Sequence, residues 1–259
     1  MMNQESNDED TNPLAVFSAE EIAGDTETNT QLKQLHDLQS MNSKLVIRQL
    51  PSQGLSFQLW PAASTLVSLL DSYRLQPKES PLFPILSSIS TRPIRILELG
   101  SGTGLAGIAA AATLEADVIL SDLPHVLPNL LFNAEANAGV VSANKGAIKV
   151  QSIRWGEPED VASLDNFDLL IAADVVYHDH LFEPLLQTLS CLLLRGGSSG
   201  SFLMAHLRRW KKDSVFFKKA RKLFHINTIH SDPPLPGDRV GVTVYHFSVK
   251  DDHHRKRLS

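Results

Sequence analysis

The chain has 259 residues, of which 42% are hydrophobic and 20% are charged, and its formal net charge is -5. This composition fits one α/β domain with a full core, and the acidic balance excludes a protein whose whole surface is built to bind nucleic acid. Cys191 is the single cysteine, so no intrachain disulfide can form. No apolar run is long enough to cross a bilayer and no secretory signal is visible, so we expect a cytoplasmic protein, with the nucleus as the alternative, and no membrane partner.

Both ends of the chain are predicted to be tails. Residues 1–40 are rich in Asp, Glu, Asn, Thr and Gln and contain no Lys or Arg before Lys33, which is typical of a solvated acidic tail. Residues 251–259 predict a basic tail. A single domain is therefore expected from residue 41 to residue 250.

A hairpin and a helix are expected at the start of this domain. Residues 45–49 and 55–59 predict two short strands on either side of a turn with the sequence PSQG. A helix follows from Trp60 to about Tyr73, because proline suits a first helical turn. Residues 76–92, rich in Pro and Ser, predict a loop.

The most informative stretch is a short apolar strand that leads straight into a glycine turn. Residues 94–99 are typical of a strand buried on both faces of a parallel sheet. Gly100, Gly102 and Gly104 then allow a tight turn and close backbone approach, and residues 105–112 are small and apolar enough for a helix packed on the sheet. The sequence therefore predicts a ligand on this turn.

Two carboxylates indicate which ligand this is. Glu98, at the strand tip, would repel a pyrophosphate but would help to hold an amino group. Asp122 ends the next apolar run, where a carboxylate can accept both hydroxyls of a ribose. S-adenosylmethionine has both groups and is favoured. Because Gly102, Gly104 and Gly107 also spell G-x-G-x-x-G, a dinucleotide stays open, as does a turn with a purely structural role.

The remaining chain continues the alternation of strands and helices. The expected elements are a helix at 127–137, strands at 148–153 and 167–173, a helix at 181–194, a strand at 201–205, a basic helix at 211–223 and a strand pair at 226–229 and 242–249. Such an order gives a doubly wound α/β sheet, whose ligands lie at the carboxyl ends of the strands.

Several side chains near that edge are open to two interpretations. Asp174 either takes part in chemistry or caps a turn, and Tyr177 is by itself more typical of packing. Trp155 would stack on adenine or cover a hydrophobic edge, and Trp60 has the same two interpretations.

Two charged stretches favour simpler explanations. In HDH at 178–180, Asp179 is well placed to cap the next helix, so no metal site is predicted. The basic residues from 208 to 222 predict a solvated helix face, with the docking of an acidic partner as the alternative.

Five segments together resemble a known family. GLSFQLWPAA, ILELGSGTGLAGIAAA, ILSDLP, RWGEPE and AADVVYHDHLFEPLLQTL are similar to the seven-β-strand protein-lysine methyltransferases called lysine methyltransferase family 16, in its methyltransferase-21-like group. ELGSGTG alone marks almost any methyltransferase of this fold class, whereas W before PAA, W-G and D-x-x-Y are specific in combination. The resemblance implies a Rossmann-like class I methyltransferase: α/β, with a doubly wound seven-stranded sheet, an antiparallel last strand and an N-terminal hairpin.

The resemblance also implies residues that hold S-adenosylmethionine. Gly100, Ser101 and Gly102 would line its methionine part, and Asp122 would bind its ribose. Glu98 would support the glycine loop.

Further residues would complete the site. Trp155 would lie along the adenine, Ala173 would contact the donor through its backbone, and Trp60 would reach the donor from the N-terminal segment. Asp174 and Tyr177 match the family's D-x-x-Y pair beside the acceptor and are the expected catalytic residues.

The implied function is S-adenosylmethionine-dependent N-methylation of a lysine in a protein substrate. The enzyme would mainly hold a neutral amine in line with the carbon–sulfur bond, and no covalent intermediate is needed. Asp174 would orient the amine but oppose its deprotonation, so positioning is favoured over a role as base. The alternatives are a methyltransferase for a small molecule or another residue type and a donor-binding module without catalysis.

Overall fold

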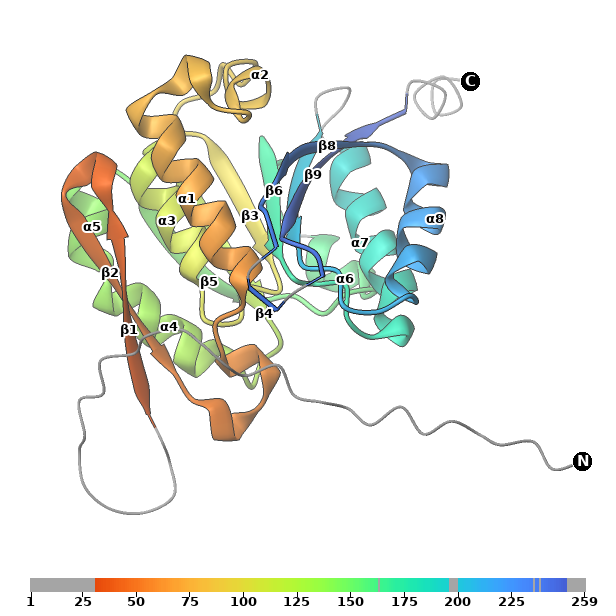
Figure 1. Ribbon diagram of the computed structural model, residues 1–259, viewed down its shortest axis with the longest axis horizontal. Helices are drawn as coiled ribbons and strands as arrows, with labels where there is room; N and C mark the ends of the chain where they lie inside the picture. Colours follow the sequence, from red (N-terminus) through yellow and green to blue (C-terminus); the bar gives the residue numbers. More distant parts are fainter. Residues whose placement is uncertain (1–30, 163, 196–199, 235, 238, 251–259) are drawn as a thin grey trace, which may run out of the picture.

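A computed structural model describes residues 31–162, 164–195, 200–234, 236–237 and 239–250 (Figure 1). Residues 1–30 of the predicted acidic tail and the predicted basic tail at 251–259 lie outside the described residues. The strands are β1 (Leu32–Leu38), β2 (Ser43–Gln49), β3 (Arg95–Leu99), β4 (Asp117–Asp122), β5 (Ala147–Ser152), β6 (Leu169–Ala173), β7 (Ser201–His206), β8 (Phe224–Ser231) and β9 (Thr243–Val249).

Seven of these strands form one sheet in the order β5-β4-β3-β6-β7-β9-β8. The pairs from β5 to β7 are parallel, whereas β9 is antiparallel to both of its neighbours. The predicted seven-stranded sheet with an antiparallel last strand is therefore confirmed. The order reverses at β3 and β6, which is where doubly wound sheets bind their ligands.

Helices cover both faces of this sheet (Figure 1). They are α1 (Pro61–Leu75), α2 (Phe83–Leu86), α3 (Leu105–Leu114), α4 (Leu127–Ala136), α5 (Ala138–Ala143), α6 (Pro158–Ala162), α7 (Phe182–Arg195) and α8 (Asp213–Leu223). Figure 1 shows α1 and α3 on one side of the sheet and α7 and α8 on the other. No helix in the described ranges has the length and apolar character needed to span a membrane.

Strand β3 contributes side chains to both layers of the core because its side chains alternate between the two faces of the sheet. Ile96 belongs to the apolar cluster under α1 and α3, while Leu97 and Leu99 belong to the cluster under α7 and α8. Four of the five residues of β3 are buried, and Arg95 is half-buried. The hydrophobic run that predicted a strand covered on both faces is thus explained by its central place in the sheet.

The N-terminal hairpin lies one strand earlier than predicted. Strand β1 pairs with β2, so residues 32–40 belong to the folded part and not to the expected acidic tail. Residues 55–57, predicted as a strand, form a 3-10 turn after Gly54, whose φ of 118° is open mainly to glycine. Of the two predicted strands only residues 45–49 form one, within β2. Strand β1 was missed because its leucines, Leu32, Leu35 and Leu38, recur at every third position, which does not predict a strand.

The structure differs from the sequence prediction in three further places. The predicted loop at 76–92 contains the helical turns Pro77–Glu79 and Phe83–Leu86. Helices α5 and α6 were not predicted, since each is only about one turn long. Helix α8 begins at Asp213 and not at residue 211, so residues 207–212 connect β7 to it.

Two buried asparagines of the α4–α5 region attach the hairpin to the domain. The side-chain oxygen of Asn133 accepts a hydrogen bond from Arg48 N at 2.8 Å, and its amide nitrogen donates to Arg48 O at 3.0 Å. Asn137 makes the same pair of bonds with Val46, at 2.8 and 2.9 Å. Asn133 also donates to Thr103 O at 2.9 Å, so it joins the hairpin to the glycine turn.

Replacing Asn133 with alanine should therefore lower the free energy of unfolding by about 2–4 kcal/mol, because Arg48 N and two carbonyls lose a buried partner. The measurement is urea denaturation at constant pH. Asn144→Ala is the matched control, since Asn144 is half-buried and its side chain donates to Val140 O and accepts a 3.3 Å hydrogen bond from Arg74 Nη2 without contacting the hairpin. Equal losses in the two variants would contradict the anchoring role.

Candidate functional site

A cavity of about 1210 Å³ opens at the carboxyl ends of β3, β4 and β6. All ten residues that the sequence singled out line it: Trp60, Glu98, Gly100, Ser101, Gly102, Asp122, Trp155, Ala173, Asp174 and Tyr177. Ligand pockets commonly measure about 300–1,000 Å³, so this cavity has room for more than one small molecule. Its position is the one expected for a doubly wound sheet.

Asp122 fixes the conformation of the glycine turn. The Gly102 N–H donates to Asp122 Oδ2 at 2.7 Å, and the Leu123 N–H donates to Oδ1 at 2.7 Å. Gly102 has φ +54°, and a Cβ there would lie 3.1 Å from Ser56 O, so an L side chain would be strained and crowded. Because each carboxylate oxygen keeps a further lone pair, Asp122 can still accept hydrogen bonds from a ligand.

Ser101 ties the same turn to β4. Its backbone N–H donates to Ser121 O at 2.9 Å, and its hydroxyl accepts from Ser121 N at 3.0 Å. The hydroxyl is therefore occupied by the protein's own backbone. Ser101 shapes the wall of the cavity, and the part that it offers to a ligand is its backbone.

Glu98 lies behind the turn, not at an open strand tip. Its side chain is 2% exposed, and Oε2 accepts a hydrogen bond from Gly107 N at 3.2 Å. A Cβ at position 107 would lie 2.5 Å from this oxygen, so glycine permits the close approach. This hydrogen bond joins Glu98 to the first turn of α3, which follows the glycine turn.

The ionisation state of Glu98 corrects the sequence analysis. Burial raises the pKa of Glu98 to about 8, and the negative charge of Asp122 adds to this effect. The hydrogen bonds from Ser101 and Gly107 lower the pKa but are outweighed. With a pKa of about 8 this carboxyl is mostly neutral at pH 7, so the expectation of an ionised acid that repels a pyrophosphate does not hold. A cation bound beside it would restore the charge.

Two tryptophans line the cavity from different segments. The Trp155 ring lies against Gly100, where a Cβ would be 2.9 Å from its Cζ2. The Trp60 indole N–H donates to Leu55 O at 3.0 Å, and its ring lies 5.0 Å below the guanidinium of Arg209. Both rings are held in place by contacts within the protein, so the aromatic surfaces are ready before a ligand enters.

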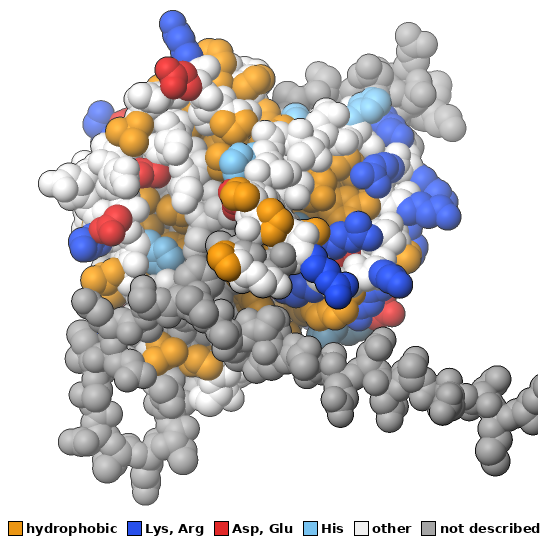
Figure 2. All heavy atoms as spheres, in the orientation of Figure 1, with side chains coloured by type: hydrophobic (Ala, Val, Ile, Leu, Met, Phe, Trp, Pro, Cys, Tyr) orange, Lys and Arg blue, Asp and Glu red, His pale blue; other side chains and the backbone are white. Residues whose placement is uncertain are grey.

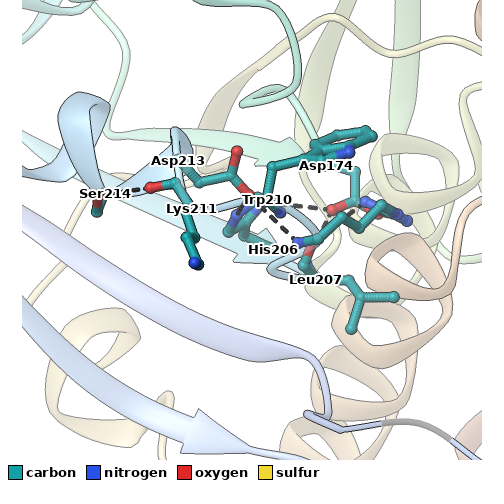
Figure 3. A network of polar contacts seen from close by, with 8 residues as sticks. Asp174, His206, Leu207, Trp210, Lys211, Asp213 and Ser214 are labelled. Carbon is teal, nitrogen blue, oxygen red and sulfur yellow. Dashed lines mark hydrogen bonds and ion pairs between the residues drawn. The ribbon is translucent and has the colours of Figure 1, made fainter. Parts of the chain in front are cut away.

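Asp174 is buried in a network of charged groups (Figure 3). Its Oδ1 accepts from Leu207 N at 2.8 Å and lies 3.4 Å from His206 Nδ1, while its Oδ2 accepts from Arg209 Nη2 at 2.9 Å. These contacts hold its backbone at φ +55°, which residues other than glycine rarely adopt.

The same contacts decide what Asp174 can do chemically. Burial favours its neutral form, but the His206 ring and the Arg209 charge outweigh burial and hold the pKa of Asp174 below its usual range. A carboxylate that is ionised and already hydrogen-bonded is a poor general base. It is suited to orienting a donor group on a ligand.

Tyr177 is half-buried beside this network, and its ring lies 4.7 Å from that of His178. Burial, followed by the negative charge of Asp122, raises the pKa of the Tyr177 phenol. The phenol is therefore neutral at physiological pH and can donate a hydrogen bond.

Sequence analysis did not predict that the segment after β7 lines the cavity. Leu207, Arg208, Arg209 and Trp210 line the cavity, although the arginines were assigned to a basic helix face. The signal was misleading because Arg208 and Arg209 lie a few residues before α8, which carries further basic residues of its own. Asp179, predicted to cap a helix, accepts a hydrogen bond from its neighbour His180 N at 3.1 Å.

Comparison with known proteins identifies related chains. The sequence profile of a family described as lysine methyltransferase matches residues 39–223. The chain is 31% identical over 181 residues to protein N-lysine methyltransferase METTL21A of Danio rerio, covering 69% of this chain and 73% of that protein. METTL21A of Mus musculus is 32% identical over 193 residues, covering 74% and 79%. EEF1A lysine methyltransferase 3 of Mus musculus is 30% identical over 193 residues, covering 74% and 72%.

The pKa of Glu98 predicts how the stability of the ligand-free protein depends on pH. The folded-state pKa is about 8 and the ordinary value is 4.5. The contribution of Glu98 to the free energy of unfolding is therefore fully present below pH 4.5 and is lost as the pH rises toward 8. The Glu98→Gln variant cannot titrate at this site. Relative to it, the wild-type protein should lose roughly 4 kcal/mol of unfolding free energy across that range.

Urea denaturation of both proteins at several pH values measures this difference. Asp117→Asn, at an exposed position in β4, is the control and should follow the wild-type curve. A constant difference between wild type and Glu98→Gln would mean that Glu98 is ionised throughout.

Proposed function

Since the chain belongs to the lysine methyltransferase family, we propose that it transfers a methyl group from S-adenosylmethionine to the side chain of a lysine in a protein substrate. The observation that carries the proposal is one cavity lined by both the glycine turn with Asp122 and the D-x-x-Y pair of Asp174 and Tyr177. The first group suits a donor that bears a ribose, and the second suits an acceptor.

The residues around the glycine turn fit S-adenosylmethionine. Asp122 keeps free lone pairs at the cavity wall, and the Trp155 ring offers an apolar face for adenine. Glu98 lies beside the turn and becomes a counter-charge once a cationic amino group is near. When bound, the donor supplies an electrophilic methyl group on a sulfonium.

The acceptor side works by orientation and by charge. Lysine must be neutral to attack, and nearby positive charges lower the pKa of an amine. Arg208, Arg209 and Arg239 line the cavity and supply such charges. Tyr177 and Trp60 offer aromatic walls for the aliphatic part of a lysine, while Asp174 is engaged with Arg209 and orients the amine instead of removing its proton.

Helix α8 is our proposed docking surface for the protein substrate. Phe216, Phe217 and Ala220 bury one side of the helix, and Lys218, Lys219, Arg221 and Lys222 are exposed on the other. Figure 2 shows Lys and Arg side chains gathered on the side of the molecule where α8 lies. A positive surface beside the cavity favours an acidic segment near the acceptor lysine. We propose no nucleic-acid partner, and we propose the cytoplasm as the location, with the nucleus as the alternative.

Transfer of labelled methyl groups to protein, with Asp174 altered, tests the assigned activity. Asp174→Asn should lower the rate by at least about 100-fold, because Arg209 and His206 lose their counter-charge and the amine loses its orienting group. Calorimetry should find the affinity for S-adenosylhomocysteine unchanged within about twofold. Asp179→Asn, which removes an exposed carboxylate from the same segment, is the control.

Full transfer by Asp174→Asn would exclude the assigned role. Mass spectrometry of the products identifies the residue or small molecule that gains the methyl group, and a product other than methyl-lysine would overturn the substrate class. If the wild type binds the donor but transfers no methyl group, the chain is a donor-binding module without catalysis.

Charge reversal tests the docking surface. Lys218→Glu with Lys222→Glu should raise the KM for the protein substrate about tenfold or more with kcat unchanged, because the long-range attraction is lost. Lys149→Glu, at an exposed position in β5 on the other edge of the sheet, is the matched control. An equal KM for both variants would place docking elsewhere.

A further inference from the structure

His206, at the end of β7, lies between two buried carboxylates (Figure 3). Its Nδ1 is 3.4 Å from Asp174 Oδ1, and its Nε2 is 3.4 Å from Asp213 Oδ2. The His206 side chain is 1% exposed and that of Asp213 is 0% exposed. Sequence analysis singled out neither residue, and the acceptor role described above uses His206 only as a neighbour that lowers the pKa of Asp174.

The charges of this cluster balance only when the imidazole is doubly protonated. Asp174 and Asp213 carry two negative charges, and Arg209, which bonds Asp174, carries one positive charge. An imidazolium supplies the second positive charge and carries a proton on each nitrogen, 3.4 Å from a carboxylate oxygen. A neutral ring would leave a lone pair beside one of the buried carboxylates, which is costly at a site that is 1% exposed.

Other groups around His206 agree with this assignment. The Phe217 ring of α8 lies 5.8 Å from the imidazole, and Tyr245 of β9 packs on Phe217 at 4.8 Å, so an apolar ring faces His206 from α8. The ionisable groups that face His206 are therefore Asp174 from the end of β6, Asp213 from α8 and, through Asp174, Arg209. Burial lowers the pKa of His206, but the two carboxylates outweigh it and raise that pKa above its ordinary value.

The two carboxylates hold opposite ends of one wall of the cavity. Asp174 accepts the Leu207 N–H, and Asp213 Oδ2 accepts the N–H groups of Arg209 and Trp210, both at 3.3 Å. His206 contacts both carboxylates, so it links the start and the end of the segment 207–212. Leu207, Arg208, Arg209 and Trp210 of this segment line the cavity.

We propose that His206, as an imidazolium between Asp174 and Asp213, is a positioning residue for methyl transfer that holds Asp174 and the segment 207–212 in place at the acceptor side of the cavity. This inference rests on the proposed function for its kinetic consequence, but the state of the ring can be measured without activity. Loss of the imidazolium should loosen the acceptor side and leave the donor side, with Gly102 and Asp122, intact.

The first experiment is ¹⁵N NMR of the imidazole rings in the full chain. At pH 7.5 both nitrogens of His206 should carry protons, and Asp213→Asn should lower the titration midpoint of this ring by about 1 pH unit or more, because one carboxylate charge is removed. A neutral tautomer of His206 in the wild type at pH 7.5 would overturn the proposal.

The second experiment separates binding from transfer. His206→Gln should lower kcat about tenfold or more while the affinity for S-adenosylhomocysteine changes by less than about twofold. His246→Gln is the matched control, since His246 is half-buried in the neighbouring strand β9 and contacts Ser201 Oγ at 3.1 Å. It should keep the wild-type kcat.

Each result has one interpretation. An active wild type with a fully active His206→Gln variant overturns the positioning role, whereas an inactive wild type overturns the proposed function. If His206→Gln does not fold, Asp213→Asn is measured in its place. That variant keeps one side-chain oxygen, which can accept the N–H groups of Arg209 and Trp210 as Oδ2 does, but it lacks the charge. Wild-type kcat in it would overturn the proposal.

Discussion

The site depends on hydrogen bonds from backbone N–H groups to carboxylates at the ends of neighbouring parallel strands. Asp122, at the end of β4, accepts the Gly102 N–H, and Glu98, in β3, accepts the Gly107 N–H. The glycine turn is thereby held in a conformation with positive φ before any ligand is present. Preorganisation of this kind lowers the free energy that binding must spend on ordering the loop.

A similar arrangement occurs at the end of β6, the neighbour of β3 on the side away from β4. Asp174 follows β6, as Asp122 ends β4, and it also accepts a backbone N–H from a segment that lines the cavity. The difference lies in its additional partners, Arg209 and His206, which keep Asp174 ionised while burial leaves Glu98 neutral. Two carboxyl groups near the ends of neighbouring strands thus differ in ionisation state because their surroundings differ.

Sequence analysis succeeded where the signal is local. The apolar run of β3, the glycine turn and the carboxylate at the end of β4 lie within about 30 residues and predicted a ligand on the turn, while the order of the elements predicted the doubly wound sheet. It failed where contacts are distant in sequence. Strand β1 is held through β2 by Asn133 and Asn137, and the link from Asp174 through His206 to Asp213 exists only once β6, β7 and α8 are packed. The charge state of Glu98 follows from its burial, which residue type cannot predict.

The central claim is that one cavity binds S-adenosylmethionine at the glycine turn and presents its methyl group toward Asp174 and Tyr177. A crystal structure of the chain with S-adenosylhomocysteine measures this most directly. The account predicts the ribose hydroxyls on Asp122, the amino acid part against Gly100 to Gly102 and the adenine along Trp155, with the sulfur facing Asp174 and Tyr177. A ligand bound elsewhere, or one oriented with its sulfur away from these two residues, would contradict it.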